Sequence, residues 1–165
     1  MIGSVGYESL EPAEFDHLAR RWDLVIDVRS RPSGRVKRGF ARADLESRLG
    51  DRYAWHGDRL GGYSKITAAA LNELARLAQT RSVLIFCREE APGDCHRHES
   101  IAVPLIKRGL LVRHLCDGEV VLADELQRAI ESDEDYECLD ESEWLSPSVG
   151  SVSGMSSLNV SPLTY

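Results

Sequence analysis

Two cysteines and two histidines lie within one short segment of the chain. The segment reads CREEAPGDCHRH, from Cys87 to His98, and directly follows the apolar run SVLIF. A cysteine near a helix start is favoured as the thiolate, because the unpaired backbone N–H groups and the helix dipole stabilise a negative charge there. The same N–H groups, joined by Arg97 and Arg88, can hold a phosphate, sulfate or carboxylate. The segment therefore predicts a reactive thiol, Cys87 or Cys95, beside an anion site, with His96 as an acid or base.

Three other interpretations of this segment are open. Cys87, Cys95, His96 and His98 are all metal-ligand types, but zinc sites usually contain tight C-x-x-C or H-x-x-x-H pairs and the chain has neither, so we predict no metal. A disulfide between the two cysteines is disfavoured in a reducing cytosol. Cys87 also fits a buried thiol that ends a strand, since free cysteine is among the most buried residue types. No cofactor is predicted.

Strands and helices are predicted to alternate on both sides of the segment. Continuous apolar runs predict strands at residues 2–6, 23–28, 82–86 and 110–115, with a shorter one at 53–55. Helices are predicted at 11–22, 42–49, 67–78, 96–108 and 122–130. This order predicts an α/β fold, with a mostly parallel sheet of about five strands and helices on both faces.

The composition changes after residue 117. We expect residues 1–117 to form the α/β domain, 118–145 to form an acidic, helical C-terminal extension, and 146–165 to form a tail rich in Ser, Gly and Pro. Arg128 is the only Lys or Arg between Asp117 and Glu143. The acidic extension is therefore expected to be a solvated face.

Polar side chains follow several of the predicted strands. In open parallel sheets, ligands bind outside the carboxyl ends of the strands. These ends carry Tyr7, Glu8, Asp27, Arg29, Ser30, Cys87 and Glu89. We expect these side chains to meet at one edge of the sheet and to form the functional site there.

Each of these strand-end residues has a predicted role. Asp27, Glu89 and Glu8 are candidate general acids or bases, and Tyr7 is a candidate proton donor or stacking face. Arg29 and Ser30, together with Arg97, are candidate anion ligands. Alternatively, Arg97 and Asp27 pair with each other and only hold the loops. The glycines Gly61 and Gly62 indicate a positive φ or a close backbone approach beside the site.

Four motifs connect the chain to a family. They are GYE at residues 6–8, DVRS at 27–30, LGG at 60–62 and C-x-E-x-x-P-x-x-C-H-R at 87–97. With these motifs, residues 1–117 resemble the domain-of-unknown-function 488 family. The strand ending in D-V-R, the strand ending in a cysteine and the closing strand after a glycine also resemble the rhodanese pattern. The resemblance implies a rhodanese-like α/β fold but supplies no established reaction.

The arginine positions depart from those of the phosphatase loops related to rhodaneses. Those loops place an arginine five residues after the cysteine. Here Arg88 follows Cys87 at once, and the next arginine is Arg97. A phosphatase-type cradle around Cys87 is therefore not predicted.

Charge and hydropathy restrict the possible partners. The formal net charge of -7 and the pI near 5.2 argue against a chain that coats nucleic acid or anionic membrane with its whole surface. A local basic strip is present, because residues 29–42 contain six Arg or Lys. We find neither an apolar run long enough to cross a bilayer nor a signal peptide at the N-terminus. We expect a cytoplasmic protein with no membrane partner; the sequence leaves the oligomeric state open.

These observations favour an enzyme. Its substrate would be an anionic molecule containing phosphate, sulfur or a nucleotide, bound at the carboxyl ends of the strands. The reaction would be a transfer or hydrolysis at a phosphoryl, sulfuryl or glycosidic centre, through a cysteine thiolate. One alternative is a module that binds nucleic acid or nucleotide with the basic loop 29–42. Another is an interaction protein that acts through its acidic segment and tail.

Overall fold

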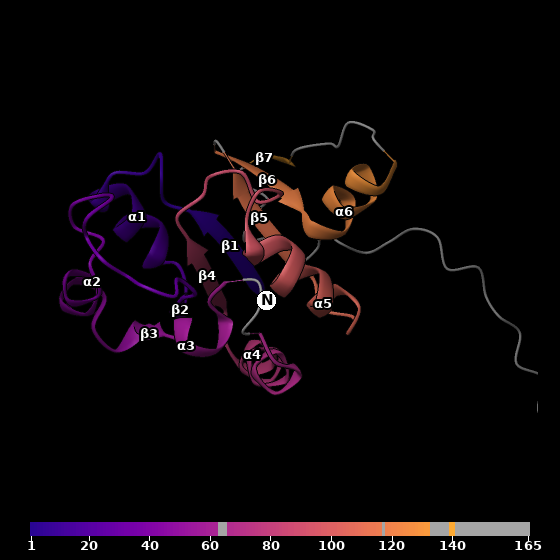
Figure 1. Ribbon diagram of the computed structural model, residues 1–165, viewed down its shortest axis with the longest axis horizontal. Helices are drawn as coiled ribbons and strands as arrows, with labels where there is room; N and C mark the ends of the chain where they lie inside the picture. The colour runs from indigo at the N-terminus through magenta and orange to yellow at the C-terminus, as the bar shows by residue number, and fades with distance from the viewer. Residues whose placement is uncertain (63–65, 117, 133–138, 141–165) are drawn as a thin grey trace, which may run out of the picture.

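Parallel strands form the centre of the sheet in the computed structural model (Figure 1). The structure describes residues 1–62, 66–116, 118–132 and 139–140, and their strands form one seven-stranded sheet in the order β3-β2-β4-β1-β5-β6-β7. The parallel strands are β1 (Ile2–Gly6), β2 (Leu24–Asp27), β3 (Tyr53–Trp55), β4 (Val83–Cys87) and β5 (Val112–Cys116). The predicted α/β class and the mostly parallel sheet are confirmed.

Helices cover both faces of the sheet, as expected. On one face, α1 (Pro12–Ala19) and α2 (Arg42–Leu49) pack against apolar side chains of β1, β2 and β4. On the other face lie α4 (Ala68–Thr80), the π-helical segment η2 (Arg97–Ala102), α5 (Val103–Ile106) and α6 (Ala123–Ser132). The short helices η1 (Gly50–Arg52) and α3 (Gly57–Leu60) flank β3. None of the helices in the described ranges has the length and apolarity that a bilayer crossing requires.

The sheet continues past residue 117, where the composition changes. Strand β6 (Glu119–Leu122) pairs antiparallel with β5, and β7 (Leu139–Asp140) pairs antiparallel with β6. Val120 and Val121 are fully buried, so two valines within the acidic stretch are sufficient to extend the sheet. The predicted helix at 122–130 is present as α6, whereas the predicted tail at 146–165 lies outside the described residues.

The predicted helix at 96–108 is present in two parts. Residues Arg97–Ala102 are π-helical, and a short α-helix follows at Val103–Ile106. Pro104 lies at the start of α5. Because proline has no N–H, the α-helical bond from residue 104 back to residue 100 cannot form, and the helix changes its hydrogen bonding at this point.

A chain of hydrogen bonds connects two buried histidines across the core. Gln127 Nε2 donates to Glu131 Oε1 at 2.8 Å, so Gln127 Oε1 is the acceptor for His98 Nε2–H at 3.2 Å. His98 Nδ1 then accepts from His114 Nε2–H at 3.0 Å, and His114 Nδ1 accepts from the Ser4 hydroxyl at 2.8 Å. Both imidazoles are neutral in this arrangement, and the chain joins α6, η2, β5 and β1.

Candidate active site

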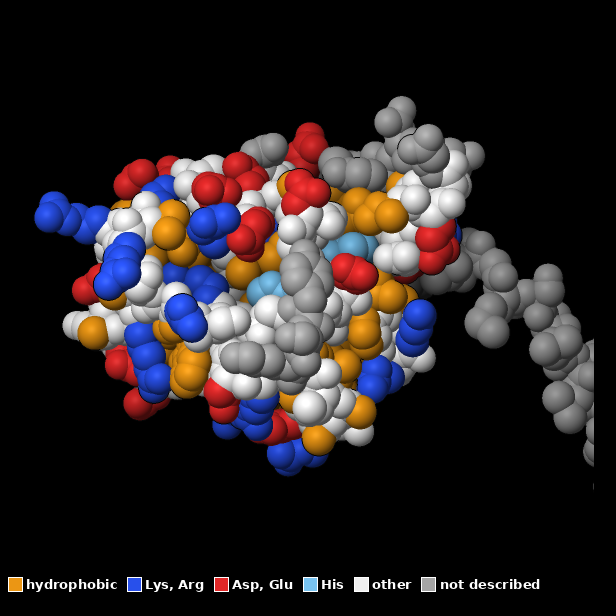
Figure 2. Space-filling model, viewed as in Figure 1, with side chains coloured by type: hydrophobic (Ala, Val, Ile, Leu, Met, Phe, Trp, Pro, Cys, Tyr) orange, Lys and Arg blue, Asp and Glu red, His pale blue; other side chains and the backbone are white. Residues whose placement is uncertain are grey.

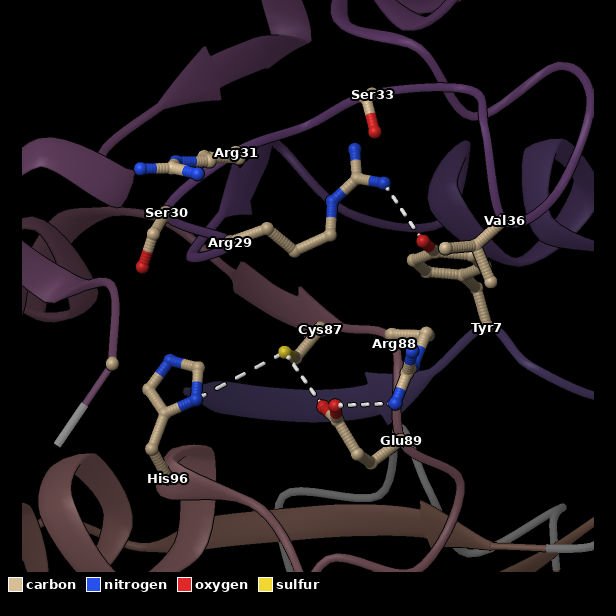
Figure 3. A pocket seen from close by; sticks show the side chains of 11 residues that line it. Tyr7, Arg29, Ser30, Arg31, Ser33, Val36, Cys87, Arg88, Glu89 and His96 are labelled. Carbon is tan, nitrogen blue, oxygen red and sulfur yellow. Dashed lines mark hydrogen bonds and ion pairs between the residues drawn. The ribbon is translucent and has the colours of Figure 1, made fainter.

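A cavity of about 300 Å³ lies at the carboxyl ends of β1, β2 and β4 (Figure 3). The lining residues come from the segments that follow these strands: Tyr7, Arg29, Ser30, Arg31, Ser33, Val36, Gly62, Cys87, Arg88, Glu89 and His96. The register explains their convergence, since Gly6 is paired with Cys87 and Asp27 with Phe86. Polar strand-end residues therefore meet at one edge of the sheet, as the sequence predicted.

Cys87 lies at the floor of this cavity. It is the last residue of β4, and its Sγ–H donates to Glu89 Oε2 at 3.0 Å (Figure 3). The Sγ of Cys95 donates to the same carboxylate oxygen at 3.3 Å. His96 Nδ1 lies 3.9 Å from the Cys87 sulfur and 3.7 Å from the Cys95 sulfur. One carboxylate and one imidazole thus contact both thiols.

The two thiols titrate as a pair. The hydrogen bond from Cys87 lowers the pKa of Cys95 against the opposing effect of burial, and His96 and Arg97 add to the decrease. The same hydrogen bond, together with burial, raises the pKa of Cys87. Burial alone would lower the pKa of His96, but the hydrogen bond to Cys95 raises it above its ordinary value. The pair therefore holds one negative charge more readily than two.

Glu89 is held as a carboxylate. Burial alone would raise the pKa of Glu89, but hydrogen bonds from Cys87, from its own backbone N–H and from Cys95 lower it. The second carboxylate oxygen, Oε1, lies 3.3 Å from Nη2 of Arg88. Glu89 therefore joins the thiol pair to a cation of the cavity wall.

In comparisons of the chain with protein-family models, with curated proteins and with solved structures, nothing matches. The function is therefore inferred from the geometry of the site.

Arg97 does not line the cavity. It is fully buried and donates from Nη1 and Nη2 to the carbonyl oxygens of Glu89 and Glu90. Its predicted role as an anion ligand does not agree with this position, and neither does the predicted pair with Asp27. Arg97 instead ties the start of η2 to the loop after β4, which fixes Glu89 beside the thiols.

Asp27 is also a positioning residue. It is fully buried and accepts from Arg29 Nε at 2.8 Å, from Arg29 Nη2 at 2.6 Å and from the Tyr53 hydroxyl at 2.8 Å. A carboxylate with all these donors is unsuited to the predicted role of general acid or base. Its effect is to hold the Arg29 guanidinium, whose Nη1 donates to the Tyr7 hydroxyl at 2.9 Å. The Tyr7 ring is stacked on Phe40, so the predicted stacking face is occupied within the protein.

The remaining predicted residues divide between the cavity and its surroundings. Ser30 and Gly62 line the cavity, and Gly62 has the expected positive φ of 76°. Gly61 is behind the wall, where a Cβ would lie 2.2 Å from the carbonyl oxygen of Gly57, so its expected close backbone approach is confirmed. Glu8 is exposed, with a carboxylate oxygen 4.0 Å from Nε of Arg88.

Three lining residues were not among the predicted site residues: Arg31, Ser33 and Val36. All three belong to the basic loop 29–42, which was interpreted as a strip for a phosphate-bearing substrate, including a nucleic-acid backbone. Figure 2 shows Lys and Arg side chains gathered on the side of the molecule that carries α1 and α2. The basic loop is therefore part of the wall of the cavity that contains Cys87.

The loop after β4 lies directly on the backbone of β1. The N–H groups of Tyr7 and Glu8 donate to the carbonyl oxygens of Cys87 and Arg88, each at 3.1 Å, so the ladder between β1 and β4 extends beyond the sheet. A Cβ on Gly6 would lie 2.0 Å from the carbonyl oxygen of Glu89. Only glycine permits this approach.

Gly6→Ala is expected to displace this loop and to lower the free energy of unfolding by about 1–3 kcal/mol, because the new methyl group collides with backbone. Denaturant unfolding followed by circular dichroism measures the change. Gly93→Ala is the matched control in the same loop, since its Cβ would meet Ile130 Cδ1 at 3.8 Å, an ordinary contact. Equal stability of the two variants would contradict the packing described here.

Proposed function

We propose that this chain is a thiol-dependent enzyme, of rhodanese-like fold and related to the domain-of-unknown-function 488 family, that acts on a small anionic substrate. The observation that carries the proposal is the shared cavity, in which the Cys87 thiol and the side chains of Arg29, Arg31 and Arg88 line one space. Guanidinium groups are suited to bind phosphate, sulfate or carboxylate through paired N–H donors. A nucleophile beside such cations meets the electrophilic centre of an anionic substrate.

Arg29 is preorganised for this role. A guanidinium has five N–H donors, and in Arg29 three of them hold Asp27 and Tyr7. The hydrogen bonds to Asp27 overcome the opposing effect of burial and raise the pKa of Arg29 above its ordinary value, so the positive charge is permanent. Arg31, which is exposed, supplies a second and more mobile cation at the cavity mouth.

The chemical step is a group transfer to sulfur. The Cys87 sulfur forms a bond to the phosphoryl, sulfuryl or glycosidic centre, and the bond from that centre to its leaving group breaks. The thiol proton passes to Glu89, whose carboxylate oxygen already accepts it at 3.0 Å, or to the pair formed by Cys95 and His96. The leaving group takes the electron pair of the broken bond. Water or a second acceptor then removes the group from Cys87 and restores the thiol.

Alkylation by iodoacetamide tests the proposal. In metal-free protein carrying Cys116→Ser and Cys138→Ser, Cys87 and Cys95 are the remaining thiols, and only Cys87 lines the cavity, so an anion bound there should protect Cys87 rather than Cys95. Phosphate, sulfate or thiosulfate should slow the reaction of Cys87 by occupying the cavity. Mass spectrometry of the digested protein gives the rate at each cysteine.

Arg31→Gln is the matched variant for the anion site, because an exposed side chain is removed without disturbing the core. The concentration of anion that gives half protection should rise by about tenfold, as expected for the loss of one charge-assisted contact. A rate of Cys87 alkylation that no anion changes would overturn the proposal.

A further inference from the structure

Three side chains of the site have the arrangement of metal ligands. Sγ of Cys87, Sγ of Cys95 and a ring nitrogen of His96 all lie within 4.8 Å of one another, and the sulfurs are 3.9 and 3.7 Å from His96 Nδ1. A tetrahedral ion with bonds of about 2.3 Å to sulfur and about 2.0 Å to nitrogen places such ligands roughly 3.5 Å apart. The two sulfur-to-nitrogen separations exceed this value by only a few tenths of an ångström. We propose that Cys87, Cys95 and His96 bind a zinc-class divalent ion, with one coordination position open to the cavity.

The orientation of His96 supports this assignment. Its Nε2 lies 3.2 Å from the backbone carbonyl oxygen of Val28, which can only accept a hydrogen bond, so Nε2 carries the hydrogen. In the neutral imidazole, Nδ1 then carries a lone pair instead of a hydrogen, and this is the atom that faces the two sulfurs. Histidines that bind metals commonly donate their other ring N–H to a carbonyl, which fixes the ring and its tautomer. His96 meets this condition before any ion binds.

The loop that carries the ligands is already fixed in place. The side chain of Arg97 holds the carbonyl oxygens of Glu89 and Glu90, and the Cys95 N–H donates to the Pro92 carbonyl oxygen at 3.1 Å. The close approach of Gly6 fixes the same loop from below. Little conformational entropy is therefore lost when the ion binds, since the three ligand atoms do not have to be gathered from a flexible chain.

The donor set determines which ions are selected. Two thiolates and an imidazole favour Zn²⁺ and Co²⁺ over Mg²⁺ and Ca²⁺, which prefer oxygen ligands. Glu89 Oε2 lies 3.0 and 3.3 Å from the sulfurs, so its negative charge also favours a cation at this place. Arg88 holds only the other oxygen of Glu89, so the fourth position is open to Glu89 Oε2, to water or to an anion in the cavity.

Cys87 cannot bind a metal ion and react as a nucleophile at the same time. A sulfur that coordinates an ion has a lone pair engaged and does not attack a substrate, so zinc inhibits the reaction of Cys87. This inhibitory consequence rests on the proposed function, whereas the binding of the ion does not. The two can therefore be tested separately.

Titration of the reduced full-length chain with Co²⁺ tests the binding. In the Cys116→Ser, Cys138→Ser background, the only thiols are Cys87 and Cys95. One equivalent of Co²⁺ should give the intense visible bands of tetrahedral cobalt with sulfur-to-cobalt charge transfer in the near ultraviolet. One equivalent of Zn²⁺ should abolish these bands, and excess Mg²⁺ should leave them unchanged. If this protein gives only the weak bands of six-coordinate cobalt, the proposal is overturned. No further variant is needed for that decision.

Variants assign the ligands. His96→Gln and Cys95→Ser should each weaken Co²⁺ binding by more than about 100-fold, while Glu89→Gln should weaken it less. Circular dichroism checks that each variant is folded. Tetrahedral bands that survive in both ligand variants would place the ion elsewhere and overturn the assignment. Alkylation of Cys87 in metal-free protein reports on the proposed function alone, so either hypothesis can fail without the other.

Discussion

The protein should lose stability as the pH falls from about 6.5 to 4.5. His114 is fully buried, and burial, followed by the electrostatic effects of the neighbouring His98 and Arg97, holds its pKa well below the ordinary value of 6.5. Burial also lowers the pKa of His98. Because the unfolded chain binds these protons more readily than the folded chain, their contribution is complete above pH 6.5 and is lost below it. Each histidine is expected to remove up to about 1.4 kcal/mol per pH unit.

Urea unfolding at several pH values measures this slope, and His114→Gln is the variant that tests its origin. Glutamine offers an amide to Ser4 and His98 but does not titrate, so the variant should be less stable at pH 7 and should lose less stability between pH 6.5 and 4.5. The titration of His96 does not obscure the loss of stability that comes from His114. Its pKa is raised, so its contribution is complete below pH 6.5 and is lost as the pH rises. Identical slopes in the two proteins would refute the role of His114.

Asp27→Asn should lower the free energy of unfolding by about 3–5 kcal/mol, which is the usual cost of leaving a buried charge without its partner. Arg29 is only 7% exposed, and the carboxylate of Asp27 compensates its charge through two hydrogen bonds. The neutral amide cannot do this. The freed guanidinium should turn away from the cavity, so anions should no longer protect Cys87 from iodoacetamide. Denaturant unfolding and the alkylation assay measure the two effects.

Tyr53→Phe is the matched control for Asp27→Asn. It removes one hydrogen bond to the same carboxylate, from a donor 2.8 Å away, and leaves the ion pair intact. The expected loss is about 1 kcal/mol, with protection by anions retained. If Asp27→Asn destabilised the protein no more than Tyr53→Phe does, Arg29 would not depend on Asp27, and its preorganisation would have to be abandoned.

The edge of the sheet where the cavity lies could be predicted because it depends on hydrophobic periodicity alone. Strands with continuous apolar sequence are buried on both faces, and parallel pairing brings their carboxyl ends together. This argument placed Tyr7, Arg29, Ser30, Cys87 and Glu89 at one edge, and all five line the cavity. Strand β6 was missed because its short apolar run lies within an acidic segment.

The roles of charged residues could not be predicted in the same way. Asp27 and Arg97 follow the pattern of site residues, yet both are fully buried and bind other parts of the protein. Sequence position does not show whether a side chain at a strand end points into the cavity or back to the chain. That choice depends on which carbonyl or guanidinium lies within reach, as Glu89 and Glu90 do for Arg97.

Cys87, Cys95 and His96 were considered as metal ligands from the sequence, but no metal was predicted there, for a related reason. Cys87 and Cys95 are too far apart in sequence to resemble a C-x-x-C pair, and spacing rules count only ligands on one tight turn. Here the chain leaves β4, folds over Gly6 and returns at Cys95. The hydrogen bonds from Arg97 to the carbonyl oxygens of Glu89 and Glu90 close the loop between the two cysteines, so a short sequence spacing is not needed. These bonds are visible only in the folded chain.

The continuation of the β1–β4 ladder beyond the sheet has a consequence for motion. The amides of Tyr7 and Glu8 donate to Cys87 and Arg88, so they open only when the central pair of strands separates. Their hydrogen exchange should therefore be as slow as that of the strand interiors, far slower than is usual for residues in loops. The peptide groups beside Cys87 are therefore expected to be among the last parts of the protein to unfold, so the cavity that contains Cys87 has a rigid floor.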